Sequence, residues 1–308
     1  MNLLITGGAG YLGTEVIRRL VAHPGDIAEI IVYDNFSRGN YGLFTQPDLA
    51  GQGNVRVVEG DLLDSRKLRE AVSRADTVLH LAARVSTPYA SDSPHTYDQI
   101  NHWGTAELVY ALEDAGTPRL IHLSTTSLYG FSEEEVNERT QPVPNSSYGL
   151  SKLRGEEQVR RLLDKGTTQT LILRAGNVFG HSPSMRFEAV INRFIFEAKY
   201  LRRISLHGQG DQVRPFIAVG DVARVIERAV HGGLAPGLYN VSAENVAVST
   251  IATLMREIYP DLEVQSLNRH VSHGSLRLAD NPTVSTILRE RPGTVSDRIR
   301  ELAATLSF

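Results

Sequence analysis

The chain of 308 residues contains no cysteine, which excludes disulfide bonds, thiolate metal ligands and a cysteine nucleophile. It also has no run of about 18 apolar residues, so no membrane-spanning helix is expected. Positive charge is scarce: 32 Lys and Arg stand against 35 Asp and Glu, without any Lys/Arg-rich run. We therefore predict neither a nucleic-acid partner nor a membrane partner, because both require a concentrated positive surface.

An export signal is missing as well. The apolar run at residues 1–6 is far shorter than a signal-peptide core and has no basic flank. Together with the lack of cysteine, this favours a cytoplasmic protein. The 41% hydrophobic and 22% charged fractions are ordinary for a globular chain, and the length suits one large or two small domains.

Over residues 1–175, short β-branched or leucine-rich runs alternate with longer segments of helical periodicity. Such a rhythm predicts βαβ units on a parallel sheet. The fold class is therefore α/β, with a Rossmann-like doubly wound parallel sheet. The expected strands are 3–6, 29–33, 55–59, 77–81, 119–124 and 170–174, and the expected helices are 11–22, 65–74, 95–115 and 147–165.

After residue 175 the alternation of strand-like and helix-like segments becomes less regular. We interpret this part as a smaller α/β C-terminal substrate lobe. The expected division is a Rossmann domain at 1–175, rejoined by about 216–241, and a lobe made of 176–215 and 242–308. Scattered helices are expected in the second part, at 186–200, 220–231, 248–258 and 295–305.

A glycine-rich turn joins the first expected strand to the first helix. Gly7, Gly10 and Gly13 are spaced G-x-x-G-x-x-G, with Tyr11 and Leu12 opening the helix. Glycines there let the backbone approach a pyrophosphate, and a helix N-terminus offers N–H donors to it. Glycine-rich turns also serve purely structural purposes, but the place between a first strand and a helix favours a dinucleotide site.

Asp34 ends the second expected strand, 21 residues after Gly13. That spacing is typical of a carboxylate that binds the adenosine ribose hydroxyls, with Asn35 beside it. A carboxylate repels a 2′-phosphate, so NAD is favoured over NADP as the cofactor. Arg38 is the nearby residue that could reverse this preference.

Two further strand ends belong to the same predicted site. Asp61 and Leu62 follow the third strand, and Ala82 and Ala83 follow the fourth. Ligands of open α/β sheets bind at the carboxyl ends of the strands. Asp61 could accept a hydrogen bond from the adenine amino group, and the two alanines would let the backbone approach the cofactor.

Tyr148 and Lys152 are spaced by four in the helix expected at 147–165, so they lie on one face, one turn apart. An ammonium there can lower the pKa of the tyrosine by favouring the phenolate. Upstream, the fifth strand ends in a hydroxyl cluster at 124–127 that can orient a substrate alcohol. By itself, Y-x-x-x-K also occurs by chance on exposed helices.

No metal site is predicted. The H-x-x-H spacing of His270 and His273 has no carboxylate partner nearby. His80, at the end of the fourth strand, is more typical of a core histidine with satisfied hydrogen bonds than of a ligand.

Eight short motifs occur in a fixed order along nearly the whole chain. They are Gly7-x-x-Gly10-x-x-Gly13, Asp34, Gly60-Asp61-Leu62, His80-Leu81-Ala82-Ala83, Asn101-His102-Trp103-Gly104-Thr105, the segment 124–130, Tyr148-x-x-x-Lys152 and Arg174-x-x-Asn177-Val178-Phe179-Gly180. In this order they resemble the extended short-chain dehydrogenase/reductases, the NAD-dependent sugar-nucleotide epimerase/dehydratase family. Each motif is weak alone, whereas the order of all eight is specific.

The resemblance implies a role for each catalytic candidate. Tyr148 would be the acid/base, and Lys152 its tuning partner and a ligand of the nicotinamide ribose. Thr125 would be the catalytic Ser/Thr. Ser124 and Thr126 are second choices, because a shift by one residue is easy in a run of hydroxyls.

The resemblance also implies NAD as the cofactor and a nucleotide-diphosphate sugar as the substrate. Asn101 matches a position that supports the active-site helix and water; it is counted with the cofactor-binding residues, and a purely structural role stays open. The helices at 95–115 and 147–165 match those that pair across a two-fold axis in the family, which implies a homodimer. The implied substrate-binding residues are Thr125, Thr126, Asn177, Arg186, Arg214 and Arg277, the arginines because a guanidinium can bind phosphate oxygens in pairs.

The family's shared step is oxidation of a sugar hydroxyl, usually at C4, with NAD as hydride acceptor. Its 4,6-dehydratases commonly carry an Asp-Glu pair directly after the catalytic Thr, where this chain has Thr126 and Ser127. Its decarboxylating branch commonly places Glu at the position of Ser127. Without a second acid/base, the favoured reaction is return of the hydride to the opposite face. We therefore predict an NAD-dependent 4-epimerase of a UDP- or dTDP-hexose.

Three other functions stay open. The acidic residues at 133–135 lie just beyond the hydroxyl cluster and could supply an acid for a nucleotide-sugar 4,6-dehydratase. An NAD-dependent dehydrogenase or reductase of a related carbonyl substrate would release its cofactor at each turnover. A non-catalytic dinucleotide-binding sensor is disfavoured, because such relatives usually lack the Tyr or the Lys that this chain retains.

Overall fold

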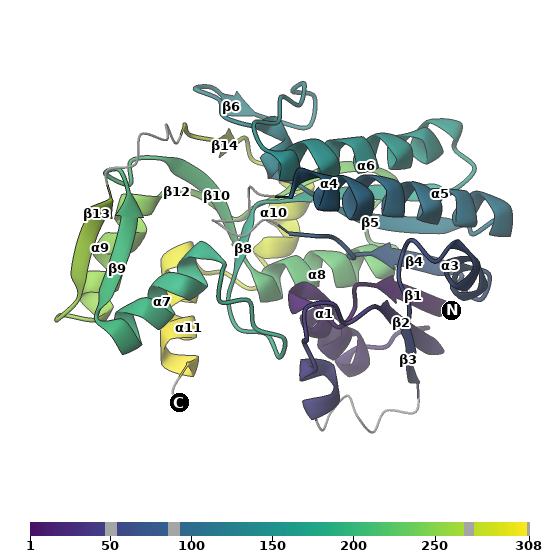
Figure 1. The fold of residues 1–308 in the computed structure, drawn as a ribbon, viewed down its shortest axis with the longest axis horizontal. Helices are drawn as coiled ribbons and strands as arrows, with labels where there is room; N and C mark the ends of the chain where they lie inside the picture. The colour runs from purple at the N-terminus through teal and green to yellow at the C-terminus, as the bar shows by residue number, and fades with distance from the viewer. Residues whose placement is uncertain (47–53, 86–92, 268–273, 307–308) are drawn as a thin grey trace.

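A parallel sheet of seven strands forms the centre of the protein, in the order β11-β7-β5-β4-β1-β2-β3 (Figure 1). The computed structural model describes residues 1–46, 54–85, 93–267 and 274–306. The chain starts in the middle of the sheet, builds outward to β3, and returns through β4 to the other side. The strands are β1 (Asn2–Thr6), β2 (Glu29–Asp34), β3 (Val55–Glu59), β4 (Thr77–His80), β5 (Arg119–Thr125), β7 (Gln169–Ala175) and β11 (Gly237–Val241).

Helices cover both faces of this sheet, because successive side chains of a strand point to opposite faces. Leu3 and Ile5 of β1 pack in one core, which the helices α1 (Tyr11–Ala22), α8 (Val219–Val230) and α10 (Pro282–Leu288) enclose. Leu4, between them, belongs to the core on the other face, which α3 (Ser65–Val72), α5 (Gly104–Ala115) and α6 (Ser147–Lys165) enclose. Burial on both faces explains why the strands are continuous apolar runs.

The remaining elements form a lobe beyond one end of the sheet, on the left in Figure 1. Its separate core buries Phe194, Met255 and Ile299. Three small sheets belong to this part: β12-β10-β8, β13-β9 and β14-β6. Their bounds are β6 (Glu135–Val136), β8 (Asn177–Phe179), β9 (Arg203–His207), β10 (Val213–Ala218), β12 (Glu244–Ala247), β13 (Glu263–Leu267) and β14 (Arg277–Leu278), with helices α7 (Val190–Leu201), α9 (Val248–Ile258) and α11 (Val295–Thr305).

The predicted fold class is confirmed, and the expected strands up to residue 175 agree with the structure to within one residue at each end. The helix expected at 95–115 differs, because it consists of α4 (Pro94–Tyr97), a π-helical turn (Asp98–Trp103) and α5. A π-helical turn widens the helix locally and is frequent at functional sites. Within the described residues, no helix has the length and apolarity to cross a bilayer.

Residues 219–241 return to the large sheet after the first excursion into the lobe. Helix α8 packs against α1, and β11 pairs in parallel with β7. The strand before them, β10, pairs instead with β8 and β12 in the lobe. The chain therefore crosses between the two parts at Gly176, at the start of α8 and after β11. It returns to the large sheet once more with α10, which the expected lobe segment 242–308 included. A cavity lies at the crossing at Gly176.

Candidate active site

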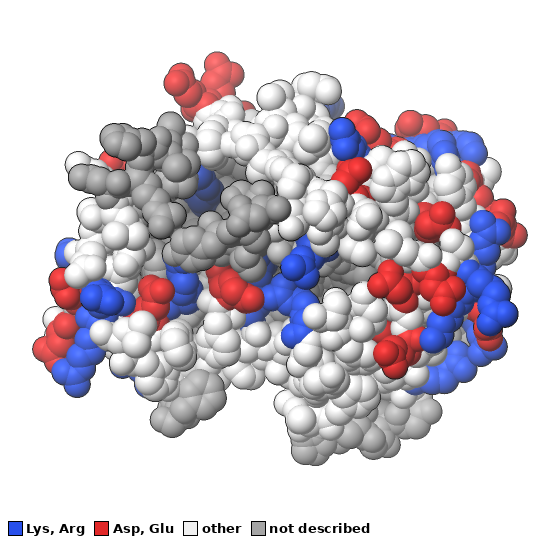
Figure 2. All heavy atoms as spheres, in the orientation of Figure 1, with Lys and Arg blue, Asp and Glu red and all other residues white. Residues whose placement is uncertain are grey.

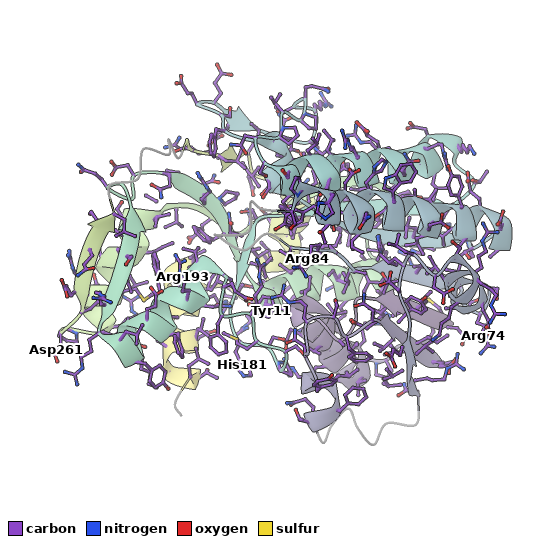
Figure 3. The ribbon with its side chains drawn as sticks, viewed as in Figure 1. Tyr11, Arg74, Arg84, His181, Arg193 and Asp261 are labelled. Atoms are coloured by element: carbon purple, nitrogen blue, oxygen red, sulfur yellow. The ribbon has the colours of Figure 1, made fainter. Side chains whose placement is uncertain are left out.

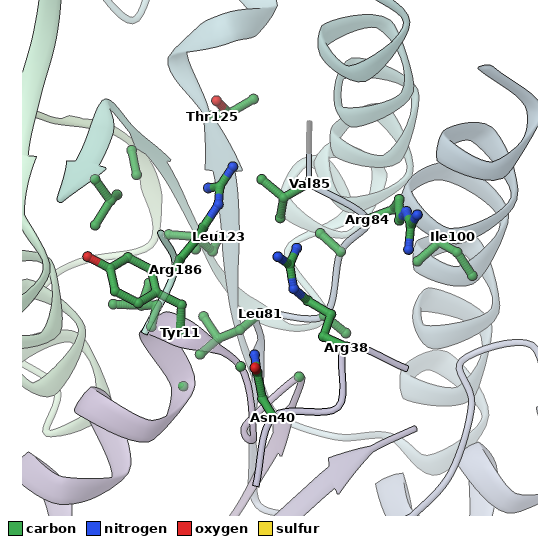
Figure 4. Close-up of a pocket in the computed structure, with 18 of the residues that line it drawn as sticks. Tyr11, Arg38, Asn40, Leu81, Arg84, Val85, Ile100, Leu123, Thr125 and Arg186 are labelled. Atoms are coloured by element: carbon green, nitrogen blue, oxygen red, sulfur yellow. The ribbon is translucent and has the colours of Figure 1, made fainter. Parts of the chain in front are cut away.

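A cavity of about 630 Å³ lies where the carboxyl ends of the central strands face the lobe. Figure 4 shows part of its wall, with Thr125 at the end of β5 and Tyr11 at the start of α1. Figure 2 shows Lys and Arg side chains in the hollow at the middle of this face. The arginines that line the cavity are Arg38, Arg84 and Arg186. This is the position at which open α/β sheets bind ligands.

Most of the predicted site residues line this one cavity, although they come from distant parts of the sequence. Those predicted for the substrate are Thr125, Asn177 and Arg186. Those predicted for the cofactor are Gly7, Gly10, Tyr11, Leu12, Gly13, Asp34, Asn35, Asp61, Leu62, Ala82, Ala83 and Tyr148.

The glycine turn exposes its backbone to the cavity. Gly7 has a φ of 73°, and a Cβ atom there would lie 2.5 Å from the Ala82 nitrogen, so only glycine fits. Helix α1 begins at Tyr11 with Gly10 as its N-cap, and no side chain caps it. Its first N–H groups are therefore available to an anion in the cavity. This cradle fits the pyrophosphate of a dinucleotide.

Backbone donors fix Asp34 at the end of β2. Its Oδ2 accepts a hydrogen bond from the Ala9 nitrogen at 3.0 Å, and its Oδ1 accepts one from the Phe36 nitrogen at 2.9 Å. Burial raises the pKa of the carboxyl group, and these hydrogen bonds oppose the rise. Beside it, Asn35 donates to Asp61 Oδ2 at 2.7 Å, so the ends of β2 and β3 form one polar wall.

An ion pair bridges the cavity between the sheet and the lobe. Arg38 Nη2, in the loop after β2, donates to Glu188 Oε1, in the segment before α7, at 2.8 Å. Both residues line the cavity. The charge of Arg38 is therefore paired with a carboxylate that lies 150 residues away in the sequence.

Helix α6 and strand β5 bring the predicted tyrosine and threonine together. The helix begins after Ser146, whose hydroxyl accepts a hydrogen bond from the Gly149 nitrogen at 3.0 Å. Tyr148, in its first turn, forms a hydrogen bond with Thr125 at the end of β5. The ring of Tyr97 meets the Tyr148 ring edge to face, with 6.2 Å between centroids. The acid/base candidate is thus held from two sides.

The pKa of Tyr148 is shifted upward in the structure. Burial of the phenol is the largest influence and raises its pKa. The Arg186 guanidinium is the largest of the influences that lower it, followed by the hydrogen bond with Thr125. Desolvation of the phenolate thus outweighs the positive charge around it, and a lowering of the Tyr148 pKa by the Lys152 ammonium stays a prediction.

Lys152 occupies the position expected one turn after Tyr148, but its ammonium points to the strand. Its Nζ donates to the Leu123 carbonyl of β5 at 2.7 Å, and the side chain is buried. Burial lowers the pKa of Lys152 to about 8, and the nearby carboxylate of Glu156 opposes this fall. Lys152 does not itself line the cavity, whereas Leu123 does.

Asn101 and Thr126 also lie outside the cavity wall. The Asn101 side chain accepts from the Arg84 nitrogen at 2.7 Å and donates to the Arg84 oxygen at 2.9 Å and to Ser151 Oγ at 3.0 Å. It thereby ties the loop after β4 to α6, which agrees with a structural role, and a contact of Asn101 with the cofactor stays a prediction. Thr126 is 2% exposed, because it opens a tight turn that directs its side chain into the core.

Of the three arginines predicted to bind substrate, Arg186 lines the cavity, whereas Arg214 and Arg277 do not. Arg214 Nη1, on β10, donates to the carbonyls of Val213 at 2.8 Å and Gly274 at 2.5 Å. Its guanidinium stacks on the Phe131 ring, 5.3 Å from the centroid. Arg277 lies on the short strand β14 beside β6. Backbone carbonyls and an aromatic ring thus hold Arg214, and substrate contact by either arginine stays a prediction.

Two charged residues of the cavity were not among the site residues predicted from the sequence. Arg84 and Glu188 both line the cavity. Figure 3 shows Arg84 and Tyr11 in the middle of the molecule, between the sheet and the lobe. Each missed residue stands within two positions of a predicted one, Ala83 or Arg186. Extending the motifs by two residues would have found them.

The histidines of the central sheet, His80 and His122, are buried in the core. His80 Nδ1 lies 2.7 Å from Thr6 Oγ1, and its Nε2 lies 3.0 Å from Thr105 Oγ1. Burial lowers the pKa of His80 to about 3, so the ring is neutral. Among the described residues, no group of three or more His, Asp or Glu side chains could hold a metal ion. His270 and His273 lie outside the described residues.

Comparison with known proteins gives one family and one fold. The sequence model of the NAD dependent epimerase/dehydratase family matches residues 3–242. A dTDP-D-glucose 4,6-dehydratase of Mus musculus is 29% identical over 289 residues, which cover 90% of this chain and 80% of that protein.

Solved structures share the fold over nearly the whole length. A UDP-glucuronic acid 4-epimerase of Bacillus cereus, in complex with UDP-glucuronic acid and NAD, has a TM-score of 0.87 at 23% identity, covering 99% of this chain and 98% of that one. A UDP-glucose 4-epimerase of Thermus thermophilus, in complex with NAD, has a TM-score of 0.83 at 25% identity, covering 99% and 98%. The relatives thus include both 4-epimerases and a 4,6-dehydratase.

Proposed function

The chain belongs to the NAD-dependent epimerase/dehydratase family, and we propose that within it this protein is a nucleotide-sugar 4-epimerase. The proposed substrate is a UDP- or dTDP-hexose. The proposed route is a 4-keto intermediate that is formed and reduced in the same site. The support for this choice is the distribution of carboxylates in the cavity.

Three carboxylates line the cavity within the described residues: Asp34, Asp61 and Glu188. The first two stand at the ends of β2 and β3, on the side predicted for adenosine, and Glu188 is paired with Arg38. The end of β5 supplies hydroxyls instead. Serine and threonine hydroxyls cannot exchange protons near neutral pH as carboxylates do. Epimerisation needs one acid/base, which Tyr148 can provide, whereas dehydration needs more.

The cavity fits NAD, the cofactor of the family. Gly7 and the uncapped N-terminus of α1 would hold the pyrophosphate, and Asp34 the adenosine ribose. Tyr148, which lines the cavity, would hold the nicotinamide ribose. The Lys152 ammonium donates to the Leu123 carbonyl and would have to turn away from it to reach the same ribose. When bound, NAD supplies the acceptor and donor of the hydride.

Tyr148 would carry the proton of the sugar hydroxyl, taking it on oxidation and returning it on reduction. Burial raises the pKa of Tyr148 and so disfavours the phenolate, while Arg186 and the Thr125 hydrogen bond favour it. Thr125 would orient the same hydroxyl. Arg186 and Asn177, on the lobe side of the cavity, would contact the nucleotide diphosphate, for which a guanidinium is suited.

The reaction is tested by NMR in D2O with a panel of UDP- and dTDP-hexoses, after the purified protein has been examined for retained NAD. The expected product is the 4-epimer without deuterium, because the hydride returns directly. A 6-deoxy-4-keto product with deuterium at C5 would reject the epimerase and establish the dehydratase. Consumption of one added NAD(H) for each substrate converted would establish a dehydrogenase or reductase. No turnover with or without added NAD(H) would favour the non-catalytic sensor.

A 4,6-dehydratase is the second candidate, supported by the name of the relative at 29% identity. It would need a carboxylate, and Glu188 is the cavity carboxylate on the lobe side. Replacing Glu188 by Gln would then abolish the 6-deoxy product. In a 4-epimerase, the same variant should retain turnover.

Asp34→Asn is expected to weaken NAD binding about tenfold and to narrow the preference for NAD over NADP, because the negative charge that repels a 2′-phosphate is lost. Arg38 remains paired with Glu188 in this variant, so strong NADP binding is expected only when Glu188→Gln is added. Dissociation constants of NAD and NADP measure both effects. Glu59→Gln, at the position of β3 opposite Asp34, is the control. Unchanged NAD affinity in Asp34→Asn would contradict the adenosine assignment.

A homodimer through α5 and α6 is also proposed. These helices pack side by side (Figure 1). Their surface exposes Tyr110 and Leu150, and the π-helical turn directly before α5 exposes Trp103. Such an apolar face is typical of an interface. Trp103→Glu is expected to turn a dimer into a monomer in light scattering, while Phe196→Glu, at an exposed aromatic of α7, should not. Equal masses for both variants would contradict this interface. A cytoplasmic location stays a prediction.

A further inference from the structure

A fully buried ion pair lies behind the candidate active site. Glu156 of α6 and Arg174 of β7 are both 0% exposed. Arg174 binds the carboxylate with two nitrogens: Nε donates to Oε2 at 3.0 Å, and Nη2 donates to Oε1. Its third nitrogen, Nη1, donates to the Tyr129 hydroxyl at 2.6 Å. The carboxylate is thus held rigidly between the helix and the sheet.

Such a pair is poorly explained by stability alone. Removing two charges from water costs so much that replacement by apolar residues is often neutral or favourable. The surroundings of this pair are otherwise well packed, with Leu162 of α6 and Ile172 of β7 fully buried in the same core. The contacts of the Glu156 carboxylate with strand β5 indicate a role beyond stability.

Glu156 and Lys152 form hydrogen bonds with consecutive residues of β5. Glu156 Oε2 accepts a hydrogen bond from Ser124 Oγ at 2.7 Å, and Lys152 Nζ donates to the Leu123 carbonyl at 2.7 Å. The two side chains are one helical turn apart on the same face of α6. The next residue of the strand is Thr125, which forms a hydrogen bond with Tyr148. Three side chains of α6 and two of β5 are thereby held in one register.

Glu156 is also the acidic group that acts on Lys152. Burial lowers the pKa of Lys152 to about 8, and the charge of Glu156 raises it. The other titratable groups facing Lys152 are His80 of β4 and His122 of β5, whose pKa values burial lowers, so both rings are neutral. Arg160, on the outer side of α6, approaches Glu156 Oε1 at 3.3 Å and is 41% exposed.

We propose that Glu156 is a positioning residue that fixes the end of β5 against α6 and supplies the negative charge opposite the Lys152 ammonium. Arg174 holds this carboxylate in place, and Tyr129, which donates in turn to Asn240 Oδ1 at 2.9 Å, holds Arg174. The inference rests on the proposed function only for the roles of Thr125, Tyr148 and Lys152 in turnover.

The chain has four lysines, Lys67, Lys152, Lys165 and Lys199, so the titration of Lys152 can be followed directly. In protein labelled with ¹³C at the lysine ε-carbon, the Lys152 signal is assigned by its loss in Lys152→Met. In Glu156→Gln the Lys152 titration is expected to shift to lower pH, because the opposing carboxylate is neutral. Glu157→Gln, which changes the exposed neighbour on the same helix, should leave the titration unchanged.

Activity gives the second readout. In Glu156→Gln the alkaline limb of the kcat profile should move to lower pH. A fall of about one unit in the pKa of Lys152 gives about a fivefold loss at pH 8, which approaches tenfold at higher pH. KM should change less. A uniform loss at every pH, or an unshifted Lys152 titration in a folded Glu156→Gln protein, would overturn the proposal.

Loss of one charge could leave Arg174 unpaired and prevent folding. The double variant Glu156→Gln with Arg174→Gln removes both charges and keeps amides that can pair, and the same downward shift is expected in it. A wild-type protein that turns over no nucleotide sugar would reject the proposed function. The Lys152 titration would still decide the role of Glu156, because it requires no substrate.

Discussion

Tyr148→Phe is expected to lower kcat on the nucleotide sugar by about 1000-fold, because the hydroxyl that takes and returns the substrate proton is removed. The ring remains, so its contact with Tyr97 and the start of α6 should persist. The fold should therefore stay near that of the wild type, while NAD binding should weaken by less than about tenfold, because one hydroxyl contact with the nicotinamide ribose is lost. Steady-state kinetics, together with the thermal unfolding midpoint and the dissociation constant of NAD, measure the three effects separately.

Tyr110→Phe is the matched control for this result. Tyr110 lies on the exposed face of α5, 45% accessible to solvent. Its hydroxyl is outside the cavity wall, so activity should be unchanged. Less than a tenfold loss in Tyr148→Phe, with the control at wild-type activity, would reject Tyr148 as the acid/base.

Gly7→Ala is expected to abolish tight NAD binding and to lower the free energy of unfolding by roughly 3 to 5 kcal/mol. Its φ of 73° is strained for alanine, and the new Cβ would meet the Ala82 nitrogen at 2.5 Å and the Ala82 Cα at 2.6 Å. The obstacle is backbone at the end of β4, so no side-chain rotation relieves it. Chemical denaturation and NAD titration measure the two losses.

The Gly39→Ala variant measures the cost of backbone strain alone, without the steric clash that a Cβ at position 7 makes with Ala82. Gly39 also has a positive φ, 64°, but no atom of another part of the described chain lies within 4 Å of the position its Cβ would occupy. Only the strain of the left-handed conformation remains, about 1 kcal/mol. Equal destabilisation of the two variants would show that the close approach of Gly7 to Ala82 is unimportant.

The cofactor half of the site was predictable because local geometry fixes it. A glycine turn between a strand and a helix, and polar residues at the ends of parallel strands, meet at one sheet edge in any fold of this class. Tyr148 and Lys152 share a helix face whenever the helix forms, since four residues make about one turn. For these residues, the spacing in the sequence therefore predicts their relative positions in the structure.

The lobe half was less predictable. Strands of two to five residues, such as β14 and β9, carry little periodicity, so none of the small lobe sheets was expected. Resemblance placed Arg214 at the substrate, but in the structure its guanidinium binds two backbone carbonyls. Short elements are positioned by their tertiary packing, which residue order does not show.

The sequence by itself determined the α/β class, the order of the central elements, the dinucleotide turn and the pairing of Tyr148 with Lys152 on one helix face. Only the tertiary structure decided that Arg38 pairs with Glu188, that Arg174 pairs with Glu156, and that burial raises the pKa of Tyr148. The reason is physical: backbone geometry depends on near neighbours, whereas the charge state of a side chain depends on its burial and on partners that folding brings from elsewhere.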